Sequence, residues 1–558
     1  MGSSTFLQVQ IGMRMRFDSI TKHLSSIIFA LSTLSFAVLA LKRGQDASWD
    51  FRNYHYYNAY AFFNDRLSYD IAPAQIQTYF NPTLDLLPFL LTQHFPPFVL
   101  SLSLSAWHGL NVWLLFLIGR ELFVKADLPN PLLWAVICAI TGATGAATQA
   151  EVGMCLHDLT VSVFVLGAVW FYLRACHGKN SISDRPSLWH LSASGFLLGL
   201  SAGLKLSFAI YVLGMGMAVF VVQLAMLRQY KAFLIFVLSA SSALLLAAGP
   251  WMWVLWKQFA NPLFPMYNAF FQSPYYAPEN TSDARFLPAN LLEALSFPFK
   301  FDLTHHQGSE LQFRDFRVTS LYVAMLLAGI YAIIRAIFHP RSKPIIAKSK
   351  DYPLMVFWLL IFIWTTYLVW LKQFAIYRYL VGIELLAPIA LVCLASLFKP
   401  RSRFVQVVLG VILVLLVVNT KSSKWGRFHA ESNGFFGVQV PAIENPNHAV
   451  VLMASDSPQS YVIPAFPKSV RFVRIEGNFI HSTEKTALTD QIRTKISESV
   501  DNLYLLTEPT TLQEGVSKVN EYLTDHTITI NQCWTVTTKL DPISLCRLNV
   551  GNKGEPKP

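Results

Sequence analysis

The chain has 558 residues, of which 53% are hydrophobic and 14% are charged. Soluble domains carry roughly 25% charged residues, and the mean hydropathy of this chain is +0.40. This composition excludes a soluble enzyme and indicates a multi-pass membrane protein. The formal net charge of +11 comes from short basic clusters between apolar runs. Because no continuous basic stripe or nucleic-acid-reading motif is present, we expect no nucleic-acid partner.

Apolar runs predict about eleven membrane spans in chain order. The first covers residues 24–41, and the others lie near 98–118, 131–148, 156–173, 189–206, 209–226, 232–256, 318–338, 353–371, 376–397 and 404–419. Lys and Arg gather in alternate loops, which the positive-inside rule places in the cytoplasm. The N-terminus is then cytoplasmic and the C-terminal tail extracytoplasmic. No small-residue cleavage site follows the first run, so we expect a retained span. The short, Pro-rich segment 81–97 is expected to be a partly embedded helix of the first outer loop.

The first outer loop, residues 42–97, opens with the segment SWDFRNYHYYNAYAFFNDRLSYD, residues 48–70. Asp50 lies at the membrane exit among aromatic side chains. A carboxylate in such a place can accept a proton from a hydroxyl group. The alternative is a helix cap or an ion pair with Arg52. Arg52, His55 and Tyr57 are the candidate substrate-binding residues of this loop.

The second outer loop carries Asp158 and two candidate substrate-binding residues, Glu151 and His157, at the end of a span. Asp158 either caps the following helix or faces Asp50 across a cavity as a second acidic group. Lys205 follows in GLSAGLKLSFAIY, where small residues predict close helix packing. This lysine either extends to the membrane interface or binds an anion.

The third outer region, residues 257–317, contributes Arg285 and Arg314, whose guanidinium groups suit phosphate oxygens. Arg378 begins a later span, and Glu384 lies about two turns deeper, so a partner for this costly pair is expected. No Walker motif, GxGxxG beside a strand, HExxH or GxSxG is present. His305, His306 and Glu310 follow no zinc spacing, so the sequence indicates neither a cofactor nor a metal.

Residues 431–558 differ in character from the preceding transmembrane domain, residues 1–430. AVVLMAS and NLYLLT predict buried strands, and TTLQEGVSKVNEYL has an apolar helical face. We therefore expect a small extracytoplasmic α/β domain. Cys533 and Cys546 lie in this tail and can form a disulfide in an oxidising compartment. The other four cysteines lie in or beside apolar runs.

Together these features resemble the GT-C superfamily of integral-membrane glycosyltransferases that use polyprenyl-phosphate-linked sugars. The resemblance covers about residues 20–420 and is carried by Asp50 in the first outer loop, the later acidic residue, GLSAGLK, the Arg378–Tyr379 pair and NPLFP. It implies Asp50 as the catalytic base, with Asp158 in reserve. It also implies phosphate binding by basic residues among Lys205, Arg285, Arg314 and Arg378, and contacts of loop aromatics such as Tyr54, Tyr56 and Tyr57 with the sugar or lipid. Many such proteins have Asp-Glu where this chain has Asp50–Phe51, which leaves a divalent-metal requirement open.

The predicted function is transfer of a hexosyl or pentosyl group from a polyprenyl-phosphate donor to an acceptor hydroxyl of a glycan, lipid or protein. We expect it at the outer face of the bilayer, in cell-envelope glycan biosynthesis at a bacterial inner membrane. The alternatives are a carrier or flippase for a lipid-linked sugar, and an envelope scaffold without catalysis. Charges that gather at the outer ends of spans, rather than along a pore, favour chemistry at the surface.

Overall fold

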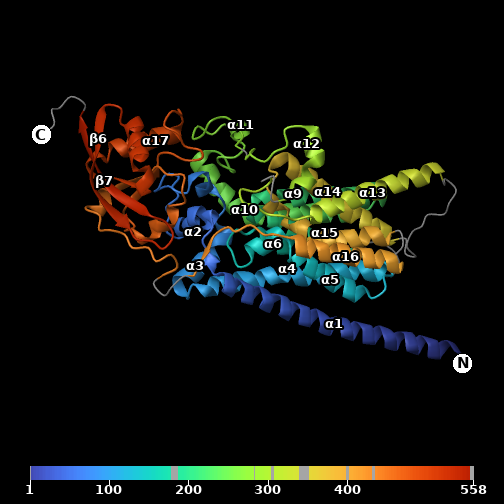
Figure 1. Ribbon diagram of the computed structural model, residues 1–558. Helices are drawn as coiled ribbons and strands as arrows, with labels where there is room; N and C mark the ends of the chain where they lie inside the picture. The colour runs from blue at the N-terminus through green and yellow to red at the C-terminus, as the bar shows by residue number, and fades with distance from the viewer. Residues whose placement is uncertain are drawn as a thin grey trace.

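The computed structural model describes residues 2–176, 186–281, 283–302, 307–338, 351–397, 401–429 and 434–552. His305 and His306 lie outside the described residues. A helical part is followed by a smaller sheet domain at one end of the helices (Figure 1). The predicted class, a polytopic helical domain followed by a small α/β domain, is confirmed.

Within the described residues, eight helical stretches are long and apolar enough to cross a membrane. They are Thr21–Arg43 in α1 (Gly2–Arg43), α4 (Phe98–Lys125), α7 (Asp158–Ala175), Leu206–Met226 around α9 (Ala209–Val219), α10 (Tyr230–Phe259), Arg317–Ile334 in α13 (Arg317–Phe338), α14 (Asp351–Gln373) and Tyr377–Ser396 around α15 (Val381–Ser396). Shorter apolar helices are α5 (Pro131–Ala143), α8 (Leu188–Leu204) and α16 (Arg403–Asn419). These helices lie where the apolar runs predicted spans, while the number that cross the bilayer stays a prediction.

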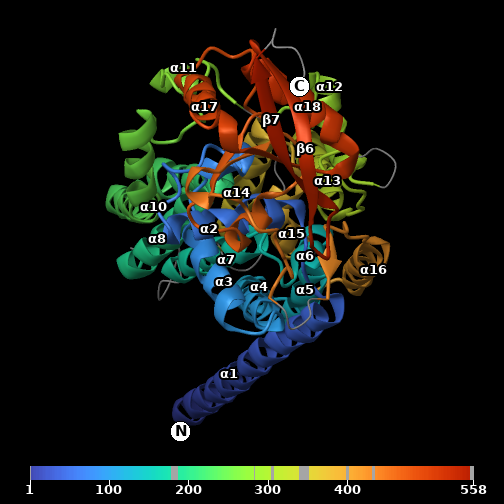
Figure 2. The ribbon, with the colours of Figure 1, turned by 90° about the vertical axis from the view of Figure 1, so that its left-hand side faces the viewer.

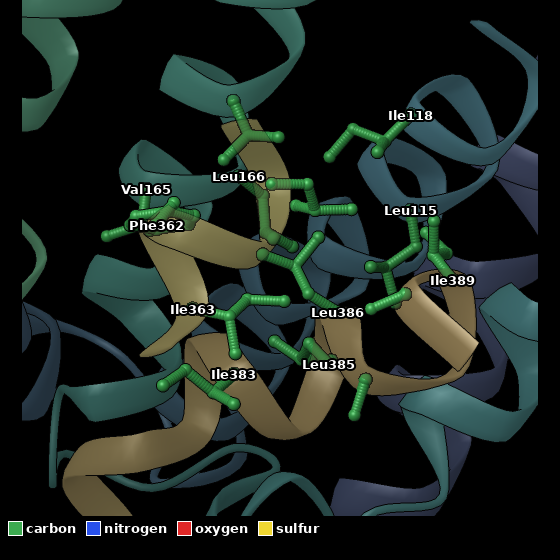
Figure 3. Close-up of a cluster of buried hydrophobic side chains, with 14 of the residues drawn as sticks. Leu115, Ile118, Val165, Leu166, Phe362, Ile363, Ile383, Leu385, Leu386 and Ile389 are labelled. Atoms are coloured by element: carbon green, nitrogen blue, oxygen red, sulfur yellow. The ribbon is translucent and has the colours of Figure 1, made fainter. Parts of the chain in front are cut away.

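The core of the helical part surrounds α15, whose residues are almost all buried. Figure 3 shows how side chains of four helices meet there: Leu115 and Ile118 of α4, Val165 and Leu166 of α7, Phe362 and Ile363 of α14, and Ile383, Leu385, Leu386 and Ile389 of α15. Lipid is as apolar as these side chains, so the helices are held together here by close van der Waals packing rather than by removal of side chains from water. This packing fixes the ends of α7 and α15, which carry functional side chains.

Small residues bring α8 against α10, as GLSAGLK predicts. A Cβ atom added at Gly199 would overlap the carbonyl oxygen of Ala240, and one at Gly203 would lie 2.8 Å from atoms of Leu244 and Ala247. The close approach positions the end of α8, where Lys205 lies.

The first outer loop folds as η1 (Phe51–His55), α2 (Tyr56–Phe63), η2 (Gln75–Tyr79) and α3 (Thr83–His94). Segment 81–97 is thus a short helix, and Leu87 on it is 65% exposed. The second loop contains α6 (Ala146–Glu151), and the third contains α11 (Asn268–Phe271), α12 (Leu291–Ser296) and η5 (Phe297–Lys300). η6 (Tyr377–Leu380) leads into α15.

The tail forms a five-stranded sheet with strand order β4-β3-β5-β7-β6. β3 (Val450–Met453) is parallel to β4 (Arg471–Arg474) and β5 (Leu503–Thr507), and the hairpin of β6 (His526–Val536) and β7 (Ile543–Asn552) is antiparallel. The helices are α17 (Ala487–Ser497) and α18 (Leu512–Tyr522). Cys533 and Cys546 are cross-strand partners joined by a disulfide.

The sheet domain packs against the first outer loop. Figure 2 views the molecule from the end at which the sheet domain lies. Ile71 pairs with Val473 at the edge of the sheet. Arg66 forms a two-pronged ion pair with Asp70 and donates to the carbonyls of Lys468 and Val470. Near the membrane exit, β1 (Gln45–Asp46) pairs with β2 (Arg427–Phe428). The tail and the Asp50 loop therefore lie on the same side of the helices.

Candidate active site

Two carboxylates and two cations meet at the loop ends of the helices. Arg378 donates from Nη1 to Oδ2 of Asp50 at 2.6 Å. Lys205 Nζ lies 2.6 Å from Oδ1 of Asp158. Arg378 Nε lies 3.9 Å from Oδ2 of Asp158 and so links the two pairs. We call Asp50, Asp158, Lys205 and Arg378 the charged cluster.

Each member comes from a different element. Asp50 directly precedes η1, and Asp158 is the first residue of α7. Lys205 is the extended residue between α8 and the next helical turn, and Arg378 lies in η6. Charged side chains at span ends are costly unless paired, and here each is paired with the opposite charge.

Asp46 connects the two outer loops beneath the cluster. Its side chain accepts from the backbone N–H of Ser48 at 2.7 Å and of Cys155 at 2.7 Å. The first contact shapes the turn before Asp50, and the second holds the segment before Asp158. Asp46 thus fixes the distance between the two acids of the charged cluster.

Aromatic rings lie beside the two cations of the charged cluster. The guanidinium of Arg378 lies 5.3 Å from the ring of Tyr379 and 5.5 Å from that of Trp425, and Lys205 Nζ lies 5.6 Å from Tyr379. Such stacking holds a cation without neutralising it. A small, partly open cavity beside Arg378 is lined by Trp425, Tyr377 and Ala146 among others. The side chain of Arg378 is 15% exposed, so it is not completely closed off from solvent.

Asp50 and Asp158 differ in exposure. The side chain of Asp50 is 13% exposed and that of Asp158 is 0% exposed. The hydroxyl of Tyr54 also lies 3.4 Å from Asp50 Oδ2. Asp50 is thus the acid that an incoming hydroxyl can contact, whereas Asp158 is covered by its partners.

Glu151 lies close to the cluster and is buried. Its Oε2 accepts from the N–H of Leu159 at 2.8 Å, and its Oε1 has no hydrogen-bond partner among the described residues. Burial, and then the negative charge of Asp158, raise the pKa of Glu151 well above its usual value. The environment therefore favours the neutral acid.

A second polar group lies beside the charged cluster. Asp85 Oδ1 is 2.7 Å from Nδ1 of His55 and 2.8 Å from Nε2 of His157. All three side chains are buried, and burial lowers the pKa of both imidazoles and raises that of Asp85. Sequence reasoning selected His55 and His157 but missed Asp85, which stands among leucines in NPTLDLLPF with no local signal of chemistry.

Besides His55, Glu151 and His157, four further residues predicted to bind substrate lie outside the charged cluster. Arg52 pairs with Asp541 of the sheet domain at 2.6 Å, rather than with Asp50. The buried hydroxyl of Tyr57 donates to Asp70 and so supports the docking of the tail. Arg285 pairs with Asp283 and Glu310 and is 61% exposed. Arg314 donates from Nε to the carbonyl of Asn419. Arg52, Tyr57 and Arg314 are thus held by contacts with other segments of the chain, whereas Arg285 lies largely in solvent.

Glu384 has a backbone partner rather than a cation. Its carboxylate accepts from the N–H groups of Ala147 and Thr148 at 2.9 Å each and from the Thr148 hydroxyl at 2.7 Å. It therefore caps the first turn of α6. A partner was expected for a charged residue at this depth in a span, and the first turn of α6 provides it.

No protein-family model matches the chain, and no curated protein matches it. Among solved structures, ArnT from Cupriavidus metallidurans bound to undecaprenyl phosphate is 12% identical, with a TM-score of 0.43 over 93% of this chain and 97% of that chain. AglB, the archaeal oligosaccharyltransferase from Archaeoglobus fulgidus in complex with an inhibitory peptide and a dolichol-phosphate, is 11% identical, with a TM-score of 0.44 over 96% and 75%. Similarity at this level decides nothing about activity, which we argue from the charged cluster.

Proposed function

We propose that the protein is a membrane glycosyltransferase that moves a hexosyl or pentosyl group from a polyprenyl-phosphate donor to an acceptor hydroxyl at the outer face of the bilayer. The observation that carries the proposal is the charged cluster: a partly exposed carboxylate lies beside two cations at the ends of apolar helices. A base and phosphate-binding cations at a membrane surface are the groups that this reaction requires.

In the proposed reaction the acceptor hydroxyl loses its proton to Asp50, and its oxygen bonds to the anomeric carbon of the sugar. The bond between that carbon and the phosphate oxygen breaks, and polyprenyl phosphate leaves with the electron pair. Lys205 and Arg378 stabilise the negative charge that develops on the phosphate. Arg378 serves both groups, because it contacts Asp50 through Nη1 and carries further N–H donors for the phosphate.

Exposure favours Asp50 over Asp158 as the base. Asp158 has no exposed side-chain surface and lies against Lys205 and Arg378. Its proposed role is to orient these two cations, and it is the reserve candidate for the base. Tyr54, Tyr379 and Trp425 are the aromatic rings around the cluster that we propose for the sugar face.

Purified protein incubated with polyprenyl-phosphate sugars and candidate acceptors tests the function. We expect release of free polyprenyl phosphate together with a glycosylated acceptor. A carrier would move the intact donor across the membrane of a proteoliposome without releasing polyprenyl phosphate, and a scaffold would do neither. Either of these results would contradict the proposal.

Labelling of introduced cysteines tests the proposed side. Asp65→Cys in the first loop and Glu498→Cys in the tail lie at exposed positions on the same side of the molecule, and Arg401→Cys lies in a loop predicted to be cytoplasmic. The free cysteines among the described residues are buried, so their background is low. An impermeant reagent should label positions 65 and 498 in intact cells, and position 401 only after permeabilisation. The reverse pattern would refute the orientation.

A further inference from the structure

We propose that His55, Asp85 and His157 bind a divalent transition-metal ion with borderline ligand preference, such as Zn²⁺. One ligand atom from each residue lies within 4.8 Å of the other two. Two imidazole nitrogens and a carboxylate oxygen are a donor set that Zn²⁺ uses, with an open position left for water or a substrate group. This inference goes beyond glycosyl transfer and takes up the metal requirement that the sequence leaves open.

The observed hydrogen bonding leaves this group incompletely satisfied. Both rings approach the same atom, Asp85 Oδ1, while the far nitrogens, His55 Nε2 and His157 Nδ1, have no hydrogen-bond partner among the described residues. If the rings donate to Asp85, two buried lone pairs are left without donors. If the protons lie on the far nitrogens, two lone pairs instead point at Asp85. A cation between the three residues would take up the two near lone pairs and the charge of the carboxylate together, while the far nitrogens would carry N–H groups.

The three ligand atoms must rearrange modestly to hold an ion. A tetrahedral Zn²⁺ with bonds of about 2.0–2.1 Å separates its ligand atoms by about 3.3 Å. The two contacts of Asp85 Oδ1 measure 2.7 and 2.8 Å, so these atoms must spread by about 0.5 Å to reach that spacing. The two imidazole nitrogens lie within 4.8 Å of each other and must adopt the same spacing when an ion binds.

The backbone at His157 is a separate observation in favour of the site. His157 has φ of 66°, in the left-handed region, which costs a non-glycine residue of order 1 kcal/mol or more. This conformation places the imidazole against Asp85 at the turn before α7. Strained backbone of this kind gathers at functional sites.

The site would position both acids of the charged cluster. His55 belongs to the helical turn that begins just after Asp50, and His157 is the residue before Asp158. An ion bound by both histidines and by α3 therefore fixes the two outer loops relative to each other. His55, Asp85 and His157 would act as positioning residues.

Metal content tests the proposal without any donor or acceptor. The full chain, purified without a polyhistidine tag, should contain about one Zn²⁺ per molecule by elemental analysis. After removal of metal, titration with Co²⁺ should give a visible absorption band that saturates at about one equivalent and is displaced by Zn²⁺.

Variants assign the ion to the three residues. His55→Gln, Asp85→Asn and His157→Gln should each lower metal content about tenfold or more and abolish the Co²⁺ band. The control is His94→Gln, at the exposed end of the same α3, which should keep both. Size-exclusion elution monitors folding, and the wild-type Co²⁺ titration decides the matter if the buried variants aggregate. Wild-type protein with no metal and no Co²⁺ band, or equal loss in His94→Gln, would overturn the site, whether or not transfer activity is found.

Discussion

Replacement of Lys205 by Met separates the two roles that the structure gives this residue. Lys205 Nζ lies 2.6 Å from Asp158 Oδ1, and the Asp158 side chain is fully buried. Removing one partner of a buried pair costs about 3–5 kcal/mol, and the nearby Arg378 Nε at 3.9 Å offsets part of this loss. Lys205→Met should therefore lower the melting temperature as well as donor affinity.

The loss of donor affinity has its own magnitude. A hydrogen bond to a charged group contributes about 1.5–3 kcal/mol, which corresponds to about 10–150-fold in Kd. The assay is equilibrium binding of a fluorescent polyprenyl phosphate to the detergent-solubilised protein, beside thermal unfolding of the same samples.

The double variant Lys205→Met/Asp158→Asn distinguishes a phosphate ligand from a mere counter-ion. The neutral amide that replaces the Asp158 carboxylate no longer needs a cation, so stability should recover toward the wild-type value, while donor binding should stay weak. If the double variant binds polyprenyl phosphate as tightly as the wild-type protein, Lys205 serves only Asp158, and the reasoning about the phosphate is wrong.

Three further perturbations test the surroundings of the site. Arg66→Met should destabilise the docking of the tail by about 3–5 kcal/mol, because it leaves the fully buried Asp70 without a cation. Arg52→Met removes a partly exposed pair and should cost about 1 kcal/mol or less. Limited proteolysis between the domains should be faster in the Arg66 variant, and equal rates in both variants would contradict this prediction. Burial raises the pKa of Glu151, so the folded state binds this proton more tightly than the unfolded state, and stability falls as pH rises above the unfolded pKa of about 4.3 toward the folded value. Glu151→Gln should therefore unfold at a higher temperature than the wild-type protein at pH 7–8, and at the same temperature near pH 4. The opposite order of unfolding temperatures would refute the shift. The double variant Cys533→Ser/Cys546→Ser removes the cross-strand disulfide and should lower the stability of the sheet domain by about 3 kcal/mol. Chemical denaturation measures this loss. An unchanged midpoint of the denaturation curve would show that the disulfide does not stabilise this domain.

Much of the fold follows from the sequence because its strongest signals are local. A run of about 20 apolar residues is long enough to span a bilayer whatever surrounds it, and the described helices lie where such runs occur. The strands at 450–453 and 503–507 were predicted for the same reason, from short apolar runs.

The pairing within the site does not follow from local signals. Ionisable residues at span ends drew attention to Asp50, Asp158, Lys205 and Arg378, but Asp50 meets Arg378 across 328 positions of the chain. No spacing rule predicts such a contact, which depends on how α15 packs in the core.

Other contacts of candidate residues also depend on partners that are remote in the chain. Arg52 was predicted to bind substrate, but Asp541 of the tail holds it. Asp85 resembled an ordinary residue at the start of a helix, and only the fold brings it between His55 and His157. Tyr57 is oriented by Asp70, whose own position depends on the docked sheet domain.

The most direct test of the account is the turnover of Asp50→Asn, measured as release of polyprenyl phosphate from a saturating donor. Asp158→Asn serves as the comparison, and Asp65→Asn, in the same loop and exposed, as the control. Asn preserves the shape of Asp50 but cannot take a proton at neutral pH, so turnover should fall about 10²–10⁴-fold. Donor binding should be unchanged or tighter, because Arg378 is freed from its carboxylate, and Asp65→Asn should keep wild-type turnover. If Asp50→Asn retains more than about a tenth of wild-type turnover, against the expected loss, Asp50 is not the catalytic base.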